Sequence, residues 1–537
     1  MNDEKKRRIP RGWTRPVLGA LSGALAGFAA LAVAELVSQW ARPQAGPVVA
    51  VGGAVIDRTP AAVKDWTIRN FGTDDKLVLQ LGILAVLALF ALALGLLALY
   101  RRRYGAAGVL LFGVVGAAAA VSRPDSTGFS DVLPSAAGAV VGAVVLFVLA
   151  GRLETRGGAT ARPDATEEDV PGRQEWDRRG FVLAASAAAA ASAGAAVFGR
   201  VLDGASGRGA VASREDLLLP VPGSPAAAVP AGARLRVPGV SSFITSNKDF
   251  YRVDTALVVP KVDATVWRLR IHGQGVARPV TLSFDDLLKR DLVERDITLT
   301  CVSNEVGGPY VGNARWTGVR LADLLADCGV EPPSKGGPAD QLVARSVDGM
   351  TIGSPVEDVM DGRDALLAVG MNGEPLPFAH GFPLRMVVPG LYGYVSACKW
   401  IEDLELTTFD AYDPYWITRK WARRAPIKTQ ARIDTPKPFA RPASGTVMVA
   451  GVAWAQHRGI DKVQVRVDDG PWQEARLAAE DSRDTWRQWS FPWTASKGGH
   501  TLTVRATDRT GTVQTEKRAR TMPDGASGRH SVVVTVD

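Results

Sequence analysis

Long apolar runs without charge fill the first 200 residues, whereas charged residues, Trp and Pro are mixed along the rest of the chain. A helix that crosses a membrane needs about 20 apolar residues, because the hydrocarbon core is roughly 30 Å thick and offers the backbone no hydrogen-bond partner. The pattern therefore predicts a membrane region of about five transmembrane helices over residues 1–200. The runs that meet or approach the required length are Val17 to Val37, Leu77 to Tyr100, Ala106 to Val121, Leu133 to Ala150 and Phe181 to Phe198.

Lys and Arg residues gather on one side of these runs. Residues 1–15 hold six, residues 101–103 hold three and residues 151–180 hold six, against five in residues 40–76 and one in residues 122–132. Because cytoplasmic loops carry the excess of Lys and Arg, this distribution places the N-terminus in the cytoplasm. We therefore expect a multi-pass protein of the cell membrane, with everything after residue 200 on the extracytoplasmic side.

Two arginines, Arg178 and Arg179, precede the Ala-rich fifth run. A paired Arg before a mildly apolar stretch resembles a bacterial twin-arginine export signal. The alternative is the ordinary basic flank of a transmembrane helix, and this segment alone does not decide between the two. Export by the twin-arginine route suits a domain that must fold around a cofactor before it leaves the cytoplasm.

Beyond the membrane region the pattern predicts a linker and two soluble domains. Residues 201–239 are rich in Pro, Ala, Gly and Arg without an apolar period, which is typical of a tether. Residues 240–430 mix strand-like runs such as Val266 to Ile271 with short helices such as Ser283 to Lys289, which predicts an α+β domain. Residues 431–537 alternate polar and apolar positions, as in Val463 to Asp468 and Thr501 to Thr507, which predicts an all-β sandwich of immunoglobulin type.

Composition narrows the range of functions. The formal net charge is +8, but the Lys and Arg residues are spread out and many flank apolar runs, so we do not expect nucleic-acid binding. Three cysteines, Cys301, Cys328 and Cys398, are too few for a disulfide framework or a four-Cys zinc site. A disulfide between Cys328 and Cys398 is an alternative to two plain buried thiols.

Cys301 stands where a strand-like run, Asp296 to Thr300, enters a Gly-rich turn. A lone Cys is usually an inert small hydrophobe. Here Asn304 follows three residues later, and the glycines allow the backbone to approach a ligand closely. A metal-bound Cys must be a thiolate, so its surroundings should supply positive charge.

A second block supplies such groups, in the stretch His380-Gly381-Phe382-Pro383-Leu384-Arg385 and in Ser396-Ala397-Cys398-Lys399. Together the two blocks resemble the sulfite oxidase family of molybdopterin-dependent oxidoreductases, over nearly all of residues 240–535. The resemblance implies a molybdenum-molybdopterin cofactor with Cys301 as catalytic thiolate and metal ligand. The other residues that match cofactor-binding positions of the family are Asn247, Tyr251, Arg252, Asn304, His380, Arg385, Ser396 and Lys399.

These residue types suit the chemistry, since Arg binds phosphate in a bidentate manner, Lys adds a point charge, and His and Asn can bond a pterin edge. Each also has an ordinary interpretation, as a buried histidine, a solvated charge or a packing aromatic. The family members that oxidise sulfite carry arginines directly after Cys-x-x-Asn, where this chain has Glu305 and Val306. A carboxylate disfavours a dianion nearby, so sulfite is in doubt as the substrate.

The resemblance predicts an enzyme that transfers an oxygen atom to or from a small molecule. A separate electron carrier, either a membrane redox protein or a quinone, is expected because no CxxCH haem motif follows. Dimerisation through the sandwich is a further expectation from the family. The rival hypothesis is a non-enzymatic membrane receptor or adhesion protein with an immunoglobulin-like tip, and a third is a scaffold that has lost its cofactor.

Overall fold

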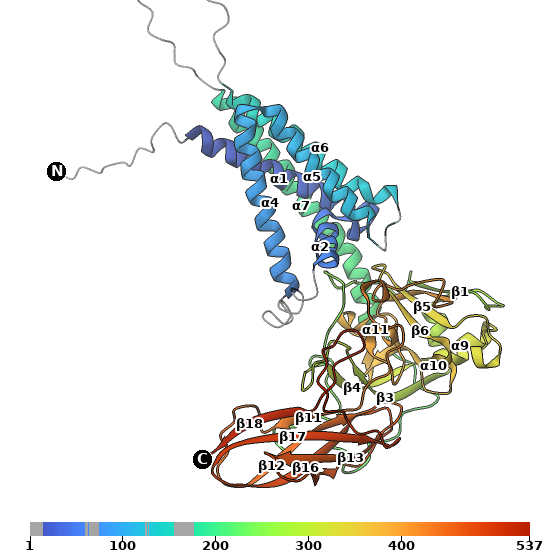
Figure 1. Cartoon of the computed structure of the whole chain (residues 1–537). Coiled ribbons are helices and arrows are strands. Elements are labelled where there is room, and N and C mark those ends of the chain that lie inside the picture. The colour runs from blue at the N-terminus through green and yellow to red at the C-terminus, as the bar shows by residue number, and fades with distance from the viewer. Residues whose placement is uncertain (1–13, 60–62, 64–74, 124–125, 127, 155–176) are drawn as a thin grey trace, which may run out of the picture. The chain divides into compact units, whose positions relative to one another are not determined.

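The computed structural model describes residues 14–59, 63, 75–123, 126, 128–154 and 177–537 (Figure 1). The chain forms two compact units. The first contains residues 1–208 with 255–258, and the second contains residues 209–254 with 259–537. The basic stretches 1–13 and 155–176, on which part of the predicted orientation depends, lie outside the described residues.

The first unit is helical, as the apolar runs predict. Among the described residues, five segments are long and apolar enough to cross a membrane: Thr14–Ala41, Leu77–Tyr100, Arg102–Val121, Phe129–Leu153 and Arg178–Gly199. A shorter apolar helix was not predicted. The helices of this unit are α1 (Thr14–Ala41), α2 (Pro47–Arg58), α4 (Asp75–Tyr100), α5 (Arg102–Val121), α6 (Leu133–Leu153) and the first part of α7 (Arg178–Glu215).

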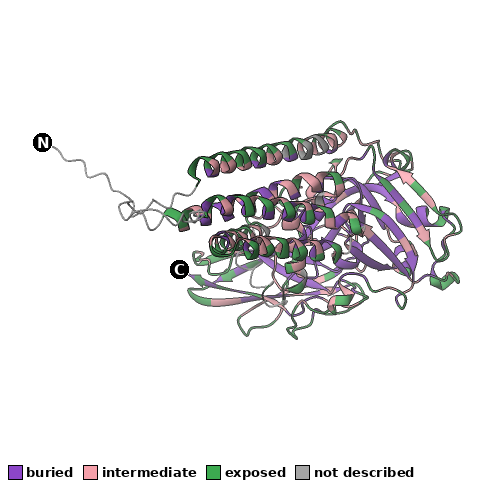
Figure 2. Ribbon diagram, turned by 90° about the horizontal axis from the view of Figure 1, so that it is seen from above, coloured by how far each residue is buried: buried purple, intermediate pink, exposed green. Residues whose placement is uncertain are grey.

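Small residues let these helices approach one another closely. A Cβ atom at Gly23 of α1 would overlap the carbonyl of Ala91 in α4, and one at Gly138 of α6 would overlap the carbonyl of Ala30 in α1. Large apolar side chains such as Leu89 are exposed, and Figure 2 shows exposed faces along the helices. Close contacts through small residues and apolar outer faces are typical of helices packed in lipid.

The region predicted as a tether, residues 201–239, is more ordered than its composition indicates. Helix α7 continues through it to Glu215. The Arg214 guanidinium donates to the carbonyls of Pro375 and Leu376 at 2.8 and 2.7 Å. Further along, Ser224 forms a parallel bridge with Val293. The side chain of Arg214 and the backbone of Ser224 thus bind this region to the soluble domain, and such contacts leave no apolar period in the sequence.

Two five-stranded sheets build the α+β part of the second unit. The first has the order β2-β1-β10-β5-β6, with only β1 and β10 parallel, and the second has the order β3-β4-β7-β8 with β9 paired to β7. The strands are β1 (Arg268–Gly273), β2 (Val280–Ser283), β3 (Leu292–Thr300), β4 (Val311–Arg320), β5 (Gln341–Ser346), β6 (Thr351–Pro355), β7 (Leu366–Met371), β8 (Glu374–Pro375), β9 (Arg385–Val387) and β10 (Ile401–Thr407). The helices are α8 (Phe284–Leu288), α9 (Leu321–Asp327), α10 (Val356–Met360) and α11 (Gly393–Ser396).

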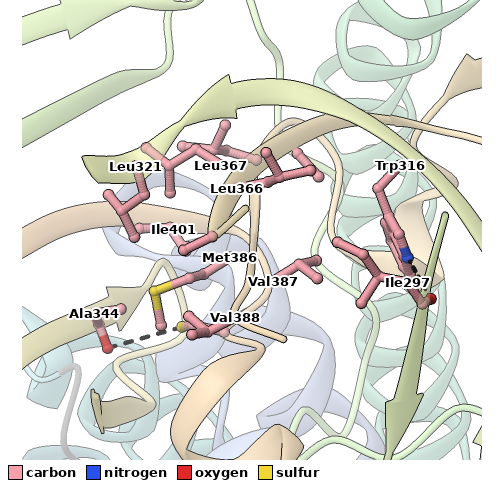
Figure 3. Close-up of a cluster of buried hydrophobic side chains, with 14 of the residues drawn as sticks. Ile297, Trp316, Leu321, Ala344, Leu366, Leu367, Met386, Val387, Val388 and Ile401 are labelled. Carbon is pink, nitrogen blue, oxygen red and sulfur yellow. Dashed lines mark hydrogen bonds between the residues drawn. The ribbon is translucent and has the colours of Figure 1, made fainter. Parts of the chain in front are cut away.

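A common hydrophobic core joins the two sheets. Figure 3 shows Ile297 of β3 beside Trp316 of β4, whose indole N–H donates to the Ile297 carbonyl at 3.1 Å. Leu366 and Met386 belong to the same core and are fully buried. The predicted helix near Ser283 is present, because Ser283 and Asp286 form a capping box at the start of α8.

Two four-stranded antiparallel sheets form residues 430–537, which we call the C-terminal sandwich. Their orders are β11-β12-β16-β15 and β14-β13-β17-β18. Alternate residues such as Val463, Trp489 and Val504 fill one core between the sheets, which confirms the period of two in the sequence. The strands are β11 (Gln430–Thr435), β12 (Gly445–Trp454), β13 (Ile460–Val467), β14 (Gln473–Glu474), β15 (Arg476–Leu477), β16 (Arg487–Ala495), β17 (Gly498–Asp508) and β18 (His530–Val536).

The C-terminal sandwich contacts β3 through buried polar groups. The N–H of Thr298 donates to the Asp484 carbonyl at 2.9 Å, and its hydroxyl accepts from the Trp486 N–H at 2.7 Å. The Gln456 amide donates to the Thr298 carbonyl at 2.9 Å and to the Thr300 hydroxyl at 3.0 Å. The sandwich therefore holds the strand that leads into the Cys301 turn.

Candidate functional site

The Cys301 turn begins directly after β3 and is held by its own backbone. The Cys301 N–H donates to the Tyr310 carbonyl at 3.0 Å, and the Asn304 N–H donates to the Cys301 carbonyl at 3.0 Å. The side-chain oxygen of Asn304 accepts from the Tyr310 N–H at 2.8 Å. Asn304 therefore closes the turn and fixes the direction of the Cys301 side chain.

The Cys301 thiol is buried, with 8% of the residue exposed. Burial raises its pKa, while the Ser303 N–H, 3.4 Å from Sγ, and the charge of Lys399 act in the opposite direction. Without a metal the thiol is therefore protonated at neutral pH. A metal ion that binds a thiolate here must release this proton, which couples affinity to pH.

His380 ends a short 3-10 turn, Phe378–His380, and is 5% exposed. Its Nε2 lies 2.9 Å from the Asn247 carbonyl, and since a carbonyl only accepts, Nε2 carries the hydrogen. Burial, together with the charge of Arg385, lowers the pKa of His380 to about 4. The imidazole is therefore neutral at physiological pH.

Arg385 opens β9 and is 5% exposed. One Nη donates to the His380 carbonyl at 3.3 Å, and the guanidinium lies 5.1 Å from the Trp316 ring centroid. Its buried Nε has no hydrogen-bond partner, and no carboxylate among the described residues forms an ion pair with it. Burial lowers its pKa. A buried guanidinium in this state is suited to bind an anion.

Lys399 lies beside these groups, with its Nζ 2.7 Å from Asp254 and 3.3 Å from the Ala379 carbonyl. Arg252 contacts the same Asp254 carboxylate at 3.0 Å. The Asp254 side chain is only 4% exposed. This carboxylate positions two predicted cofactor-binding cations, and sequence reasoning missed it because Asp254 and Lys399 are 145 residues apart.

Asn247 and Tyr251 come from the segment before β1. The Asn247 amide donates to the Met371 carbonyl and to Glu374, and its oxygen accepts from Asn372 at 2.8 Å. Burial raises the pKa of Tyr251, and the nearby Cys301 adds to this effect. Tyr251 stacks on Phe250, whose other edge meets His380. Both residues therefore join the neighbourhood of Cys301 and His380.

Ser396 is fully buried at the end of α11 and donates to the carbonyls of Leu391 and Tyr392 at 2.9 and 3.1 Å. Its hydroxyl thus holds the turn that begins α11. A Cβ atom built on Gly393 would lie 3.8 Å from the Thr300 carbonyl and 4.0 Å from the Tyr251 hydroxyl. Helix α11 therefore lies against the Cys301 turn.

The fold brings five of the predicted residues together with Asp254, which was not predicted, into one neighbourhood. We call this neighbourhood the cofactor cluster: Tyr251, Asp254, Cys301, His380, Arg385 and Lys399. Asn247 and Asn304 support it, Arg252 lies at its edge, and Ser396 bonds to the backbone behind it. The roles of these residues in binding stay predictions. A buried thiol beside buried cations, one of which has an unbonded Nε, fits a group that has both a metal and a phosphate.

Several further polar and charged side chains are not counted in this cluster. The Tyr412 hydroxyl is 3.2 Å from Thr351, and the Arg419 guanidinium stacks 3.5 Å from the Tyr415 ring centroid. Glu305 is exposed at the Cys301 turn. All three cysteines are free, so Cys328 and Cys398 are plain buried thiols rather than a disulfide.

An open groove of about 1060 Å³ lies nearby but is not lined by the cluster. Its lining includes Arg234, Arg315 and Asn372. Asn372 connects this groove to the site, since its amide donates both to Asn247 and to the Thr245 carbonyl. The chemistry of Cys301, His380 and Arg385, rather than the size of the groove, marks the functional site.

Comparison with known proteins assigns the same region. The family model described as an oxidoreductase molybdopterin binding domain matches residues 256–416, which include Cys301, His380, Arg385 and Lys399. Mitochondrial sulfite oxidase of Rattus norvegicus is 31% identical over 291 residues, covering 47% of this chain and 53% of the relative. The chain thus spans about half the length of the mitochondrial sulfite oxidases that it matches.

The match to a bacterial relative covers a larger share of that relative. The uncharacterized oxidoreductase YuiH of Bacillus subtilis (strain 168) is 35% identical over 145 residues, covering 27% of this chain and 67% of that protein. Among solved structures, the sulfane dehydrogenase SoxCD from Paracoccus pantotrophus matches with 24% identity and a TM-score of 0.48. This match covers 56% of this chain and 84% of the SoxCD chain.

Proposed function

Because this chain belongs to the sulfite oxidase family of molybdopterin-dependent oxidoreductases, we propose that it is a membrane-anchored enzyme that moves an oxygen atom to or from a small substrate outside the cytoplasmic membrane. The observation that carries the proposal is the cofactor cluster, in which a buried thiol lies beside buried cations. A receptor or adhesion protein needs no such cluster, and the family assignment decides against that alternative.

When bound, the molybdenum cofactor supplies a two-electron change, so that substrate and water yield oxygenated substrate, two protons and two electrons, or the reverse. Cys301 binds the metal as a thiolate and gives up its proton on loading. Asn304 keeps the turn closed, so that Sγ keeps one direction. Arg385 and Lys399 bind the phosphate of the pterin, and burial strengthens both contacts because water does not compete.

The remaining predicted residues orient the pterin. His380 donates through Nε2 to Asn247, which leaves Nδ1 as an acceptor toward the pterin. Asn247, Tyr251 and Arg252 form one wall, and Ser396 supports the other wall through α11. Asp254 holds Lys399 and Arg252 in place and limits the excess of positive charge.

We propose an uncharged or singly charged substrate rather than sulfite. Glu305 follows Asn304 at the mouth of the Cys301 turn and is exposed, so a dianion that approaches meets like charge. The name sulfite oxidase belongs to the relatives and describes their substrate. Sulfoxides and N-oxides are neutral donors of one oxygen atom that avoid this repulsion.

The anchor and its direction are part of the same proposal. Five helices of suitable length and composition support a membrane region, and the distribution of Lys and Arg supports a cytoplasmic N-terminus. Arg178 and Arg179 at the start of α7 support a bacterial twin-arginine route, and the two sheets of the C-terminal sandwich support an immunoglobulin-like domain. A membrane redox protein or a quinone is proposed to exchange the electrons, and a homodimer through the sandwich remains a proposal.

Elemental analysis of the purified full chain tests the proposal. We expect about one molybdenum per chain and pterin fluorescence after oxidation, with turnover in a dye-coupled screen of sulfite, sulfoxides and N-oxides. Cys301→Ser should remain folded and lose turnover by more than about 100-fold, since changes that only support a metal ligand already cost 10- to 100-fold. Cys328→Ala, at a buried thiol in α9's C-cap, should keep metal and turnover. Full turnover in Cys301→Ser, or a wild-type chain without molybdenum, would overturn the proposal.

A further inference from the structure

A stretch of thirteen residues after β10, Trp416 to Lys428, combines strong positive charge with aromatic side chains. We call it the basic segment. It contains no Asp or Glu, and its two tryptophans are Trp416 and Trp421. The basic residues in it are Arg419, Lys420, Arg423, Arg424 and Lys428. The proposed chemistry has not assigned these residues a role.

The basic segment lies directly on the elements that surround the Cys301 turn. The Tyr392 N–H donates to the Ala425 carbonyl at 2.9 Å, and the Tyr394 hydroxyl donates to the Ala422 carbonyl at 2.7 Å. The Ile427 N–H donates to the Gly390 carbonyl at 2.9 Å. These contacts attach the segment to α11, which packs against the Thr300 carbonyl next to Cys301. The segment is therefore connected to the Cys301 turn through α11.

Aromatic rings continue from α11 into the segment. The Tyr394 and Trp421 ring centroids are 5.5 Å apart, and those of Trp421 and Trp416 are 5.9 Å apart. Trp416 also meets Tyr415 at 5.0 Å. Both tryptophans are partly exposed. Partly exposed Trp beside Arg is the composition that dominates the binding energy of protein interfaces.

The charges on the segment are only partly neutralised. Arg423 contacts Asp413 at 2.8 Å and Asp410 at 3.8 Å, and Lys428 contacts Asp524 at 2.9 Å. Lys420 and Arg424 are exposed, and within the described part of the chain no acidic side chain forms an ion pair with either. The segment therefore presents uncompensated positive charge to solvent beside an aromatic surface.

We propose that the basic segment is the docking surface for an acidic electron-carrier protein. This inference rests on the proposed function, in which transfer of an oxygen atom to the substrate consumes a water and releases two electrons and two protons. The reverse reaction consumes the electrons and protons and releases the water. A carrier that accepts or donates these electrons in single steps must approach the cofactor cluster closely and leave again. Complementary charge raises the association rate by about 10- to 1000-fold without requiring a tight complex.

The positive charge of the basic segment also argues against a partner that is the basic segment of a second copy of this chain. Two such segments would bring Lys420 and Arg424 of both copies together, and like charges at an interface are unfavourable. A small anionic substrate would use the same field, however, so the test must exclude substrate. Probes of defined charge separate these cases.

The first readout is the binding of poly-L-glutamate to the full-length chain, monitored by tryptophan fluorescence. This measurement does not need the cofactor. The test variant is Lys420→Glu with Arg424→Glu. The control is Arg476→Glu with Lys497→Glu, which changes the net charge equally at exposed positions of the C-terminal sandwich. We expect about tenfold weaker binding in the test variant and little change in the control, at low ionic strength. Equal binding by all three proteins would overturn the docking proposal, whether or not the chain carries molybdenum.

Stopped-flow oxidation of the dithionite-reduced holoprotein, without any substrate, gives the second readout. The anionic oxidant ferricyanide should react about tenfold more slowly with the test variant, and a cationic cobalt complex should react faster. Poly-L-glutamate should slow the reaction with ferricyanide in the wild type and in the control, but not in the test variant. If both oxidants react equally with all proteins, the docking proposal fails and the proposed function stands. If the wild-type chain contains no molybdenum, the proposed function fails and the binding readout still decides the charge of the surface.

Discussion

The cofactor cluster and the C-terminal sandwich both contain buried ion pairs, such as Lys399 with Asp254 in the cluster, but the cluster also contains Arg385, a buried cation with which no carboxylate among the described residues forms an ion pair. In the sandwich, Asp508 is 1% exposed and accepts from Arg458 at 2.9 Å and from Thr429 at 2.7 Å. Arg432 likewise contacts Asp434 at 2.7 Å. In the cluster, Arg385 is equally buried, yet its Nε has no hydrogen-bond partner.

The difference separates charges that serve the fold from charges that serve a ligand. A buried ion pair keeps its two partners whether or not anything binds, and removal of one partner strands the other. A buried cation without a counter-charge is unfavourable until an anion arrives. We therefore expect the unmatched cation to mark the binding region, and three substitutions test whether this distinction holds.

The largest effect is expected in the sandwich. Arg458→Met leaves Asp508 buried without its cationic partner, which should cost about 3 kcal/mol of unfolding free energy. Chemical denaturation of the full chain, followed by the fluorescence of the sandwich tryptophans, measures this loss. Arg290→Ala is a suitable control, because its ion pair with Asp327 is exposed and should contribute less than about 1 kcal/mol. A stability loss no larger than that of the control would contradict the prediction that the Arg458–Asp508 ion pair stabilises the fold.

Arg385→Met should show the opposite behaviour. Without the guanidinium, cofactor retention should weaken by about 2 kcal/mol, which is typical of a hydrogen bond to a charged group. The cofactor-free protein should be no less stable than the wild type, because no carboxylate is stranded. Pterin fluorescence after dialysis measures retention, and thermal unfolding of protein from a cofactor-deficient host measures stability. If the cofactor-free variant unfolds more easily, Arg385 serves the fold instead.

The smallest effect concerns acid. His380 has a folded pKa of about 4, below its usual value near 6.5, so the unfolded chain binds the proton more readily. Stability of the cofactor-free protein should therefore fall by about 1–2 kcal/mol as the pH drops from about 6.5 to about 5. His380→Gln, which can still donate to Asn247, should remove this dependence.

Asp508 provides the comparison in the sandwich. Burial opposes its charge, but hydrogen bonds from Thr429, Thr510 and Arg458 outweigh this and lower its pKa to about 2. A carboxylate with a lowered pKa stabilises the fold above its unfolded pKa, and this contribution is lost as the pH falls from about 4 toward 2. His380→Gln should leave this second loss unchanged. If the wild type lost its stability in a single acid transition that His380→Gln does not divide, the prediction of two separate losses, one from His380 and one from Asp508, would be contradicted.

Regular periodicity was sufficient to predict most of the fold. The alternation around Val463 and Thr501 predicted β13 and β17. The apolar runs predicted five helices within a few residues of their ends, except that α7 continues to Glu215, well beyond its apolar run. Helix α2 was not predicted, because its apolar run is shorter than a membrane-spanning helix requires. The ordered contacts of residues 201–239 were not predicted from the sequence. Arg214 bonds to carbonyls some 160 residues away, and such bonds leave no local pattern.

The candidate site was predictable only through its motif. Cys301, His380 and Arg385 were found because their spacing resembles a known family, and the structure places them together. Sequence reasoning missed Asp254, because it acts through Lys399, which is distant in the sequence. It also missed the basic segment, because the contact of that segment with α11 is visible only in the fold. Ser396 was predicted to bind the cofactor, and this stays a prediction; its hydroxyl bonds to two carbonyls of its own turn, which the motif did not indicate.

The contacts of Thr298 bear on where this chain can be divided. Its N–H, its carbonyl and its hydroxyl are each bonded to a residue beyond position 455, and the side chain is completely enclosed. A cut near residue 430 would remove all three partners from the strand that ends at Cys301. Shorter versions made for crystallisation should therefore begin near Gly209 and keep the C-terminus, because a fragment limited to the family-matched residues 256–416 exposes unsatisfied backbone at the catalytic strand.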